Sequence, residues 1–263
     1  MVEKVLLRQI NKLEDYLHGD TYLAKSLNNI SPMKGEAYRK SPQKIIYDRA
    51  MALPFAAVSV LAIPFFASLI KIEDQFRKEE DRGPVFYRHE RLDQNGNPFD
   101  VIKLRSLKPC SDRISDNSEY ASQFQPEDDP RATVVGRIMR RFYIDELPQV
   151  WQVLFGDKLA FIAPRAKSAD VINKVKEQMT GELEQNYYTW LEKRSQGRPG
   201  IFNLNAVISP NPKNNLPARH ADNFQADHES LAFDILIIAL LPIKKFKGML
   251  NKRIKKTHNN HSI

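Results

Sequence analysis

Two adjacent carboxylates form the densest group of chemically useful side chains in the sequence. Asp145 and Glu146 lie in the stretch IDELPQVW, residues 144–151, and open a predicted helix whose first turn tolerates Pro148. The positive end of the helix dipole favours an ionised carboxylate there, and it also attracts phosphate. With basic neighbours, such a pair could handle a phosphoryl group and a divalent metal. The simpler interpretation, that Asp145 only caps the helix, stays open on spacing alone.

Basic side chains lie near this pair in the sequence. Arg137, Arg140 and Arg141 come just upstream of it. Lys103 and Arg105 are two residues apart on a predicted strand, so both should project from one face. They could contact phosphate, or they could belong to a solvated charged face.

The net charge of the chain is concentrated in its C-terminal tail. The 263 residues include 40 Lys+Arg and 32 Asp+Glu, a formal charge of +8, and no acid follows Asp234. Seven basic residues fall within 244–256, and without them the body is almost neutral, with 33 basic and 32 acidic residues. A protein that coats nucleic acid is usually basic throughout its fold, so no nucleic-acid partner is expected. The single cysteine, Cys110, excludes a disulfide framework and a cysteine-rich zinc site.

One uncharged apolar segment, residues 50–70, is as long as a membrane span. It contains Pro54 and Pro64, which each remove a helix hydrogen bond. If the chain turns at Pro64, the arm 50–63 is roughly 21 Å long at helical rise, less than the hydrocarbon core of ~30 Å. Four basic residues flank the segment on each side, which is typical of a segment that enters and leaves a membrane by the same face. A straight, proline-kinked span and a buried core helix are the alternatives.

The remaining elements must position the carboxylates. Residues 84–107 predict a β-hairpin, with Asn95-Gly96 supplying the positive φ angles of its turn. The stretch 108–131 predicts a polar loop, and 195–228 reads as mostly irregular. Helices are expected over 2–17, 133–141, 146–155, 168–180, 182–194 and 230–241.

These features together resemble the bacterial sugar transferase family, the monotopic phosphoglycosyl transferases that prime glycan assembly on a polyprenol phosphate. The resemblance covers roughly residues 41–241 and centres on the DELPQ motif at 145–149, and the order and spacing of its motifs are highly specific. The other matching positions are Asp48, Pro64, Gly83-Pro84-Val85, Glu90-Arg91, Asn95-Gly96, Phe99, Lys103-x-Arg105, Asp129-Pro130-Arg131, Val135-Gly136-Arg137, Gly156-Asp157, Pro164-Arg165, Arg198-Pro199-Gly200, Ser230-Leu231 and Asp234.

The resemblance implies a fold and a location. The fold is α+β and mainly helical, with an N-terminal re-entrant membrane helix broken at Pro64, a β-hairpin and amphipathic interfacial helices. Residues 41–243 would form the transferase domain, preceded by a helical extension and linker at 1–40. The tail 244–263 would lie against the anionic leaflet of the membrane. The expected location is the cytoplasmic face of the bacterial inner membrane.

The resemblance also implies a reaction. Asp145 would be the nucleophile that attacks the β-phosphate of a nucleotide diphosphate sugar, with UDP-sugar as the expected donor. The covalent phosphosugar would then pass to polyprenol phosphate, initiating assembly of an exopolysaccharide, O-antigen or glycoprotein glycan. Glu146 would be a metal-binding or acid–base neighbour, and Asp145 and Glu146 would hold the assisting Mg²⁺. Residues expected to bind substrate are Lys103, Arg105, Arg137, Arg140, Pro164, Arg165, Arg198, Pro199 and Gly200.

Departures from the family pattern leave other functions open. The family's Thr-Gly-Trp-Ala-Gln stretch is replaced by FNLNA at 202–206, which puts the identity of the sugar and nucleotide in doubt. A catalytically inactive member acting as a membrane scaffold in a glycan assembly complex is one alternative. A basic protein that binds nucleic acid through its tail is the other. The sequence leaves the oligomeric state, including a homo-oligomer, undecided.

Overall fold

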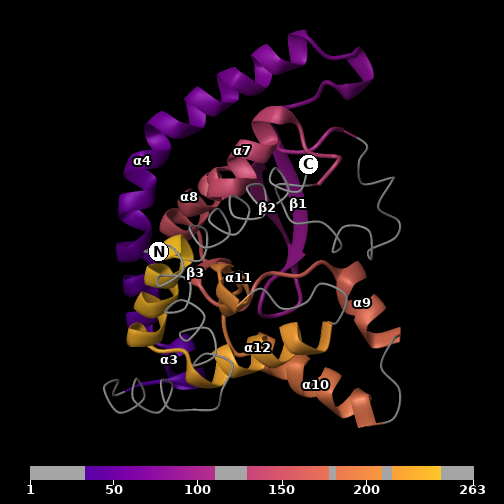
Figure 1. Ribbon diagram of the computed structural model, residues 1–263. Coiled ribbons are helices and arrows are strands. Elements are labelled where there is room, and N and C mark those ends of the chain that lie inside the picture. Colours follow the sequence, from indigo (N-terminus) through magenta and orange to yellow (C-terminus); the bar gives the residue numbers. More distant parts are fainter. Residues whose placement is uncertain (1–32, 110–128, 178–181, 209–214, 244–263) are drawn as a thin grey trace, which may run out of the picture.

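The computed structural model describes residues 33–109, 129–177, 182–208 and 215–243. A long helix flanks a body made of shorter helices, a β-hairpin and a small parallel sheet (Figure 1). This mainly helical α+β architecture confirms the expected fold class. The helix predicted at 2–17, the tail 244–263 and most of the loop predicted at 108–131 lie outside the described residues.

The apolar segment lies within one continuous helix, α4, Pro42–Gln75. Ser41 caps it by accepting a hydrogen bond from the Lys44 backbone N–H, and Pro42 occupies the first turn, where no hydrogen bond is lost. The chain stays helical through Pro54 and Pro64, so the helix is not interrupted at Pro64 as the sequence predicted. Instead, α4 bends as it passes over the body (Figure 1). Prolines bend a helix in this way when its other hydrogen bonds persist.

The predicted hairpin is present. Strands β1, Phe86–Leu92, and β2, Pro98–Leu104, pair antiparallel and follow the single turn η1, Glu79–Asp81. The connection is a five-residue loop rather than the expected two-residue turn. Gly96 alone has the left-handed conformation expected of both turn residues, with φ of 79°. Asp93 closes the loop, because its carboxylate accepts hydrogen bonds from the backbone N–H groups of Asn95 and Asn97.

Three short helical elements carry the carboxylate pair. Helix α7, Val134–Phe142, ends at Tyr143, whose left-handed φ of 59° reverses the chain. The single 3₁₀ turn η2, Ile144–Glu146, follows, and α8, Leu147–Phe155, begins directly after it. The carboxylates therefore occupy a tight turn just before the helix that was expected to begin with them.

A small parallel sheet joins two segments that are far apart in the sequence. Strand β3, Ala160–Ile162, pairs with β4, Gly200–Phe202, which the sequence did not predict. The C-terminal half also contains α9, Ala169–Glu177, α10, Glu182–Ser195, and an apolar helix over Leu231–Ile243, all of them expected. The interpretation of 195–228 as irregular is wrong, because this stretch contains β4, α11, Leu204–Ile208, and α12, Asn215–His228.

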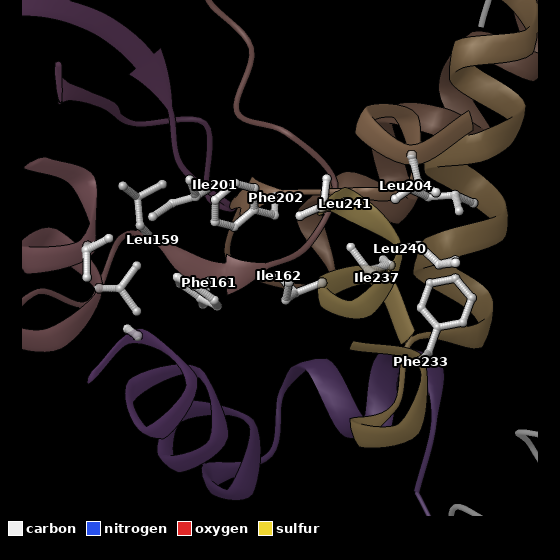
Figure 2. Packing of buried hydrophobic residues seen from close by; sticks show 14 of the residues in the cluster. Leu159, Phe161, Ile162, Ile201, Phe202, Leu204, Phe233, Ile237, Leu240 and Leu241 are labelled. Carbon is white, nitrogen blue, oxygen red and sulfur yellow. The ribbon is translucent and has the colours of Figure 1, made fainter. Parts of the chain in front are cut away.

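The core lies around the two parallel strands. Phe161 and Ile162 of β3 and Phe202 of β4 pack between α4 and the Leu231–Ile243 helix, whose Phe233 and Ile237 complete the cluster (Figure 2). Helix α8 packs against α4 and β2. The turn that carries the two carboxylates is therefore held between α7 and a helix fixed to the core.

A second set of charged residues fastens the start of α4 to this core. We call it the buried ion cluster; its members are Arg39, Lys44, Asp48, Arg198, Glu229 and Asp234, each at most 9% exposed. The Lys44 Nζ atom lies 2.6 Å from Asp234 Oδ2 and 3.0 Å from both Asp48 Oδ1 and Glu229 Oε1. It also donates a hydrogen bond to the Ile162 carbonyl of β3. The ammonium group thereby ties α4 to the strand and to the C-terminal helix.

Candidate active site

Asp145 and Glu146 are both buried at the turn between α7 and α8. They are held by different neighbours. Glu146 is bound by two basic side chains from other elements, whereas the Asp145 Oδ2 atom lies 3.5 Å from the hydroxyl oxygen of Ser106. Two adjacent carboxylates thus have separate environments, and separate roles for such a pair follow from different environments.

Glu146 is a fixed anion. The Lys103 ammonium group donates a hydrogen bond of 2.7 Å to Glu146 Oε1, and the Arg165 guanidinium donates to the same oxygen. Burial opposes ionisation, but Arg165 and Lys103 outweigh it and lower the pKa of Glu146 to about 2. The second carboxylate oxygen, Oε2, is buried without a hydrogen-bond partner among the described residues. That oxygen is available to a ligand.

The pKa of Asp145 is shifted in the direction opposite to the one that the sequence predicted. Burial raises its pKa, the negative charge of Glu146 raises it further, and Lys103, Arg140 and Arg165 oppose both effects. The helix dipole was expected to favour the ionised form, yet burial beside a second carboxylate dominates. An ionised Asp145 in this site is therefore more basic, and a better nucleophile, than an ordinary aspartate.

Two further basic side chains lie close to Arg165, and sequence reasoning did not assign them to the site. Burial and the nearby charge of Arg165 lower the pKa of Arg91 to about 10. Burial lowers the pKa of Lys167 to about 8; Asp222 opposes this shift, and Arg194, Arg165 and Arg91 add to it. The Glu90-Arg91 motif was one signal for Arg91, but nothing in the sequence indicated Lys167. Repulsion among these cations makes the region a natural site for a polyanion.

Several residues expected at the site lie elsewhere. Arg105 does not share a partner with Lys103, because it donates a 2.6 Å hydrogen bond to Asp74 near the end of α4. Arg198 belongs to the buried ion cluster, with its Nη2 atom 2.9 Å from Asp48 Oδ2. Neither guanidinium is free for substrate in this arrangement. Both were expected to bind it from sequence order, which does not show the partner of a side chain.

The arginines of α7 divide between the site and the surface. Arg140 lies near enough to lower the pKa of Asp145, and its Nη2 atom is 3.7 Å from Asp129 Oδ2. Arg137 is exposed to solvent. The helix therefore brings one of the two expected arginines towards the carboxylate pair.

A cavity of about 560 Å³ opens on the other side of Arg165. Pro164 and Pro199, both expected to contact substrate, line it. Gly200 begins β4 and pairs with Ala160 of the parallel strand β3, and a Cβ there would approach the Ala163 backbone N to 2.2 Å. Glycine is required at this position by close packing of the backbone. The 164–165 and 199–200 segments thus form a wall between the carboxylate pair and the cavity.

The carboxylate pair fits the donor set that Mg²⁺ uses. Mg²⁺ commonly takes one or two protein carboxylates and completes its coordination with water and substrate phosphates. Glu146 Oε2, buried without a partner, and the Asp145 carboxylate supply such oxygens. Among the described residues no group of three or more His, Cys, Asp or Glu forms a preassembled metal site. A metal held here would therefore depend on ligands from the substrate.

A buried carboxylate of raised pKa, a fixed neighbouring anion and surplus basic groups define a site suited to phosphoryl transfer. Comparison with known proteins specifies the family. The sequence profile described as "Bacterial sugar transferase" matches residues 39–248, and the chain belongs to that family.

Curated relatives carry related names. The chain is 27% identical over 190 residues to the exopolysaccharide production protein ExoY of Sinorhizobium fredii, an alignment that covers 69% of this chain and 78% of the relative. It is 28% identical over 184 residues to the UDP-N-acetylgalactosamine-undecaprenyl-phosphate N-acetylgalactosaminephosphotransferase of Aeromonas hydrophila, covering 68% of this chain and 40% of the relative. A third relative is the putative undecaprenyl-phosphate N-acetylgalactosaminyl 1-phosphate transferase of Bacillus subtilis, 33% identical over 52% of this chain and 69% of its own length. The chain thus spans well under half of the Aeromonas protein.

Proposed function

We propose that this protein is a phosphoglycosyl transferase that moves a sugar phosphate from a nucleotide diphosphate sugar to polyprenol phosphate. The observation that carries the proposal is Asp145, a buried carboxylate made more basic by its surroundings, beside a region of surplus positive charge. The names of the Aeromonas and Bacillus relatives support undecaprenyl phosphate as the acceptor, and the first of these names supports a UDP-sugar as the donor. The name of the Sinorhizobium relative supports exopolysaccharide as the pathway.

The reaction proceeds in two displacements. A carboxylate oxygen of Asp145 attacks the β-phosphorus of the donor, and the bond from that phosphorus to the bridging oxygen breaks. The nucleoside monophosphate leaves with the electron pair, and the sugar phosphate remains on Asp145. An oxygen of polyprenol phosphate then attacks the same phosphorus, which restores the Asp145 carboxylate and gives a polyprenyl diphosphate sugar. Lys103, Arg165 and Arg91 offset the charge on the phosphate oxygens in both steps.

The environment of Glu146 favours one of its two expected roles. A general acid must hold a proton near neutral pH, whereas Glu146 has a pKa of about 2 because Arg165 and Lys103 stabilise its charge. We therefore assign it to positioning: it fixes both basic side chains beside Asp145 and offers Oε2 to a metal. Mg²⁺, when bound, would supply charge neutralisation for the diphosphate.

The attachment of α4 supports re-entry into the membrane. Among the described residues, α4 is the helix long and apolar enough to cross a membrane. Its start is held to the body by the Lys44 and Asp48 side chains of the buried ion cluster, and its end by the pair between Asp74 and Arg105. Between these ends, Leu61 is 78% exposed. A helix fastened at both ends to one body can enter and leave the bilayer by the same face, which we take to be the cytoplasmic one.

Exposed apolar residues beside α4 support seating at the membrane surface. Val134, Ile138 and Phe142 follow one face of α7 at helical spacing, and Phe155 at the end of α8 is 79% exposed. Trp151 and Phe155 stack on each other along α8. Such amphipathic surfaces bind the membrane interface. The acceptor would thus reach Asp145 from the bilayer, and the donor would come from water.

Release of nucleotide tests the proposed reaction. Detergent-purified protein is incubated with Mg²⁺, polyprenol phosphate and a panel of nucleotide diphosphate sugars, and free nucleoside monophosphate is measured. We expect release with at least one donor, and loss of release in Asp145→Asn. A folded protein that releases nothing with any donor would instead support the inactive scaffold.

Cysteine labelling tests the topology. In a Cys110→Ser background, Ile46→Cys and Phe76→Cys place thiols at two exposed positions near opposite ends of α4. A membrane-impermeant reagent added to oriented vesicles should label both from the same side. Labelling from opposite sides would show a single crossing.

A further inference from the structure

The cavity beyond Arg165 is lined by several separate parts of the chain. The hairpin loop contributes Leu92 to Gly96, the strand ends contribute Pro164 and Pro199, α9 contributes Ile172, and α10 contributes residues between Tyr188 and Ser195. Its volume of about 560 Å³ falls within the range of small-molecule sites. The cavity has no assigned role in the reaction as described above.

One face of α10 is turned towards this cavity. Tyr188, Glu192 and Ser195 follow one another at helical spacing, all three line the cavity, and all three are exposed. Tyr188 has 46% of its surface accessible although its neighbour Tyr187 is buried. Leu191, from the same face, adds apolar surface. The helix therefore presents an aromatic ring, a carboxylate and a hydroxyl to the same space.

Two of the three charged residues that line the cavity, Asp93 and Arg194, already have oppositely charged partners. Asp93 accepts from Lys158 at 2.9 Å and from two backbone N–H groups of the hairpin loop. The Arg194 guanidinium lies over the Trp190 ring, and its Nη1 atom pairs with Asp222 Oδ2 at 3.7 Å, too far for a hydrogen bond. The lining thus offers polar contacts without surplus positive charge. It suits a neutral, partly aromatic group rather than a phosphate.

The surplus positive charge lies on the other side of the wall. Pro164 faces the cavity, while the next residue, Arg165, binds Glu146. A ligand with one neutral end and a diphosphate can therefore place the neutral end in the cavity and its phosphates beside Arg165 and Lys103. A nucleotide diphosphate sugar has two neutral ends, the nucleoside and the sugar.

We propose that the cavity between the hairpin loop and α10 binds the nucleoside of the donor. This inference rests on the proposed function. The exposed ring of Tyr188 provides a stacking surface for a base, and the exposed Glu192 carboxylate can accept hydrogen bonds from ribose hydroxyls. A sugar ring could pack its C–H face on the same tyrosine, so the binding experiment compares nucleotides with a sugar phosphate.

The position of the cavity fits the order of the two displacements. The nucleoside monophosphate comes from water and must return to it before the lipid acceptor reacts. Helix α10 packs against α9 and α12, and in Figure 1 these helices lie far from the upper arm of α4, the element with the largest exposed apolar surface. A nucleoside held there can leave without crossing the path of the polyprenol.

Equilibrium binding tests the inference separately from turnover. The probes are UMP, the other common nucleoside monophosphates and galactose 1-phosphate, each titrated into the detergent-purified full chain by calorimetry. Ser195→Trp fills the cavity, Tyr188→Ala removes the stacking surface, and Tyr188→Phe retains it. Glu177→Trp on α9, exposed and outside the lining, is the matched control for added bulk.

We expect wild type to bind at least one nucleoside monophosphate. Ser195→Trp and Tyr188→Ala should each raise its Kd by about tenfold or more, as loss of base stacking does. Tyr188→Phe, Glu177→Trp and the affinity for galactose 1-phosphate should remain near wild type. Weakened binding of galactose 1-phosphate alone would assign the cavity to the sugar and overturn the inference. Failure of wild type to bind any nucleoside monophosphate, or unchanged binding in both cavity variants, would also overturn it.

These outcomes are distinct from failure of the proposed function. If no donor gives nucleotide release while the cavity variants still weaken UMP binding, the transfer reaction is wrong and the nucleoside site stands. If release is normal and the KM of the donor is unchanged in Ser195→Trp, the reaction stands and the cavity assignment fails.

Discussion

The molecule contains two groups of carboxylates and basic side chains, and they differ in charge balance. In the buried ion cluster, three cations meet three carboxylates: Arg39, Lys44 and Arg198 with Asp48, Glu229 and Asp234. Around the catalytic pair, four cations gather near two carboxylates: Arg91, Lys103, Arg140 and Arg165 near Asp145 and Glu146. The first group is neutral as it stands, and the second needs an anion to become so.

This difference in charge balance separates a structural use of carboxylates and basic residues from the proposed catalytic use of the same residue types. A buried charge is tolerated when it is paired, and removal of one partner leaves an uncompensated charge in the interior. The buried ion cluster meets that condition and holds α4 against β3. The catalytic pair does not, because more cations than carboxylates lie around it and the positive charge is left without a full set of partners. An incomplete cluster of this kind is the expected signature of a ligand site.

The largest expected effect concerns Asp145. Asp145→Asn removes the proposed nucleophile, so the rate of nucleotide release should fall on the order of 10⁴-fold or more, as when other covalent nucleophiles are removed. The folded protein should be no less stable, because the raised pKa shows that ionised Asp145 is costly to bury. Release is measured in single turnover, and unfolding by a thermal scan of the same sample. A large drop in melting temperature would mean that the site is structural after all.

The second-largest effect should be a loss of folding stability when the buried ion cluster is disrupted. Lys44→Met leaves three buried carboxylates facing two cations, which should reduce the free energy of unfolding by roughly 3–5 kcal/mol. Lys40→Met is the matched control: the Lys40 side chain is 60% exposed and pairs with Glu36 on the surface. Chemical denaturation of both variants measures the difference. Similar stability of the two variants would contradict the structural role of the cluster.

A pair of arginine substitutions tests the comparison more closely. Arg165→Met should raise the KM of the donor by about 10- to 100-fold, because it removes a charged hydrogen-bond donor from the phosphate region, and should have little effect on melting. Arg198→Met should instead lower the melting temperature and leave the KM of the donor almost unchanged, since the Arg198 guanidinium holds Asp48 and the Leu159 carbonyl. Steady-state kinetics and thermal scans of both variants check this. If Arg198→Met changed KM without affecting melting, the sequence-based assignment of Arg198 to substrate binding would be restored.

The sequence identified the local elements and the chemistry, but not the partners of the charged residues. The hairpin and the helices around Asp145 follow from local patterns, namely turn residues, helical spacing and proline positions. Arg105 and Arg198 were misplaced because ion pairs 31 and 150 residues apart in sequence depend on how distant elements pack. The β3–β4 pair was missed because three-residue strands carry no periodicity. Burial, which reverses the expected effect of the helix dipole on Asp145, is likewise a property of the folded state.

The smallest effect is a shift in pH dependence. Asp145 must be ionised to attack, so kcat/KM should fall as the pH drops through its pKa, at a higher pH than for an ordinary aspartate because burial and Glu146 raise that pKa. Glu146→Gln removes the neighbouring negative charge and frees the positive charges of Lys103 and Arg165 to act on Asp145. Both changes favour the ionised form. The acid limb should therefore move to lower pH by about one unit, even though the maximal rate decreases.

Single-turnover nucleotide release across mildly acidic to neutral pH measures this limb in wild type, Glu146→Gln and the surface control Glu177→Gln. The control should reproduce the wild-type profile. An unshifted limb in Glu146→Gln would show that Glu146 does not raise the pKa of Asp145. A limb displaced to higher pH would mean that Lys103 and Arg165 depend on Glu146 to remain beside Asp145, and that loss of their charge outweighs loss of the carboxylate. In either case the negative charge of Glu146 would no longer account for the raised pKa of Asp145. The pH profile thus tests whether charge imbalance, the property that separates this site from the buried ion cluster, is also what controls its nucleophile.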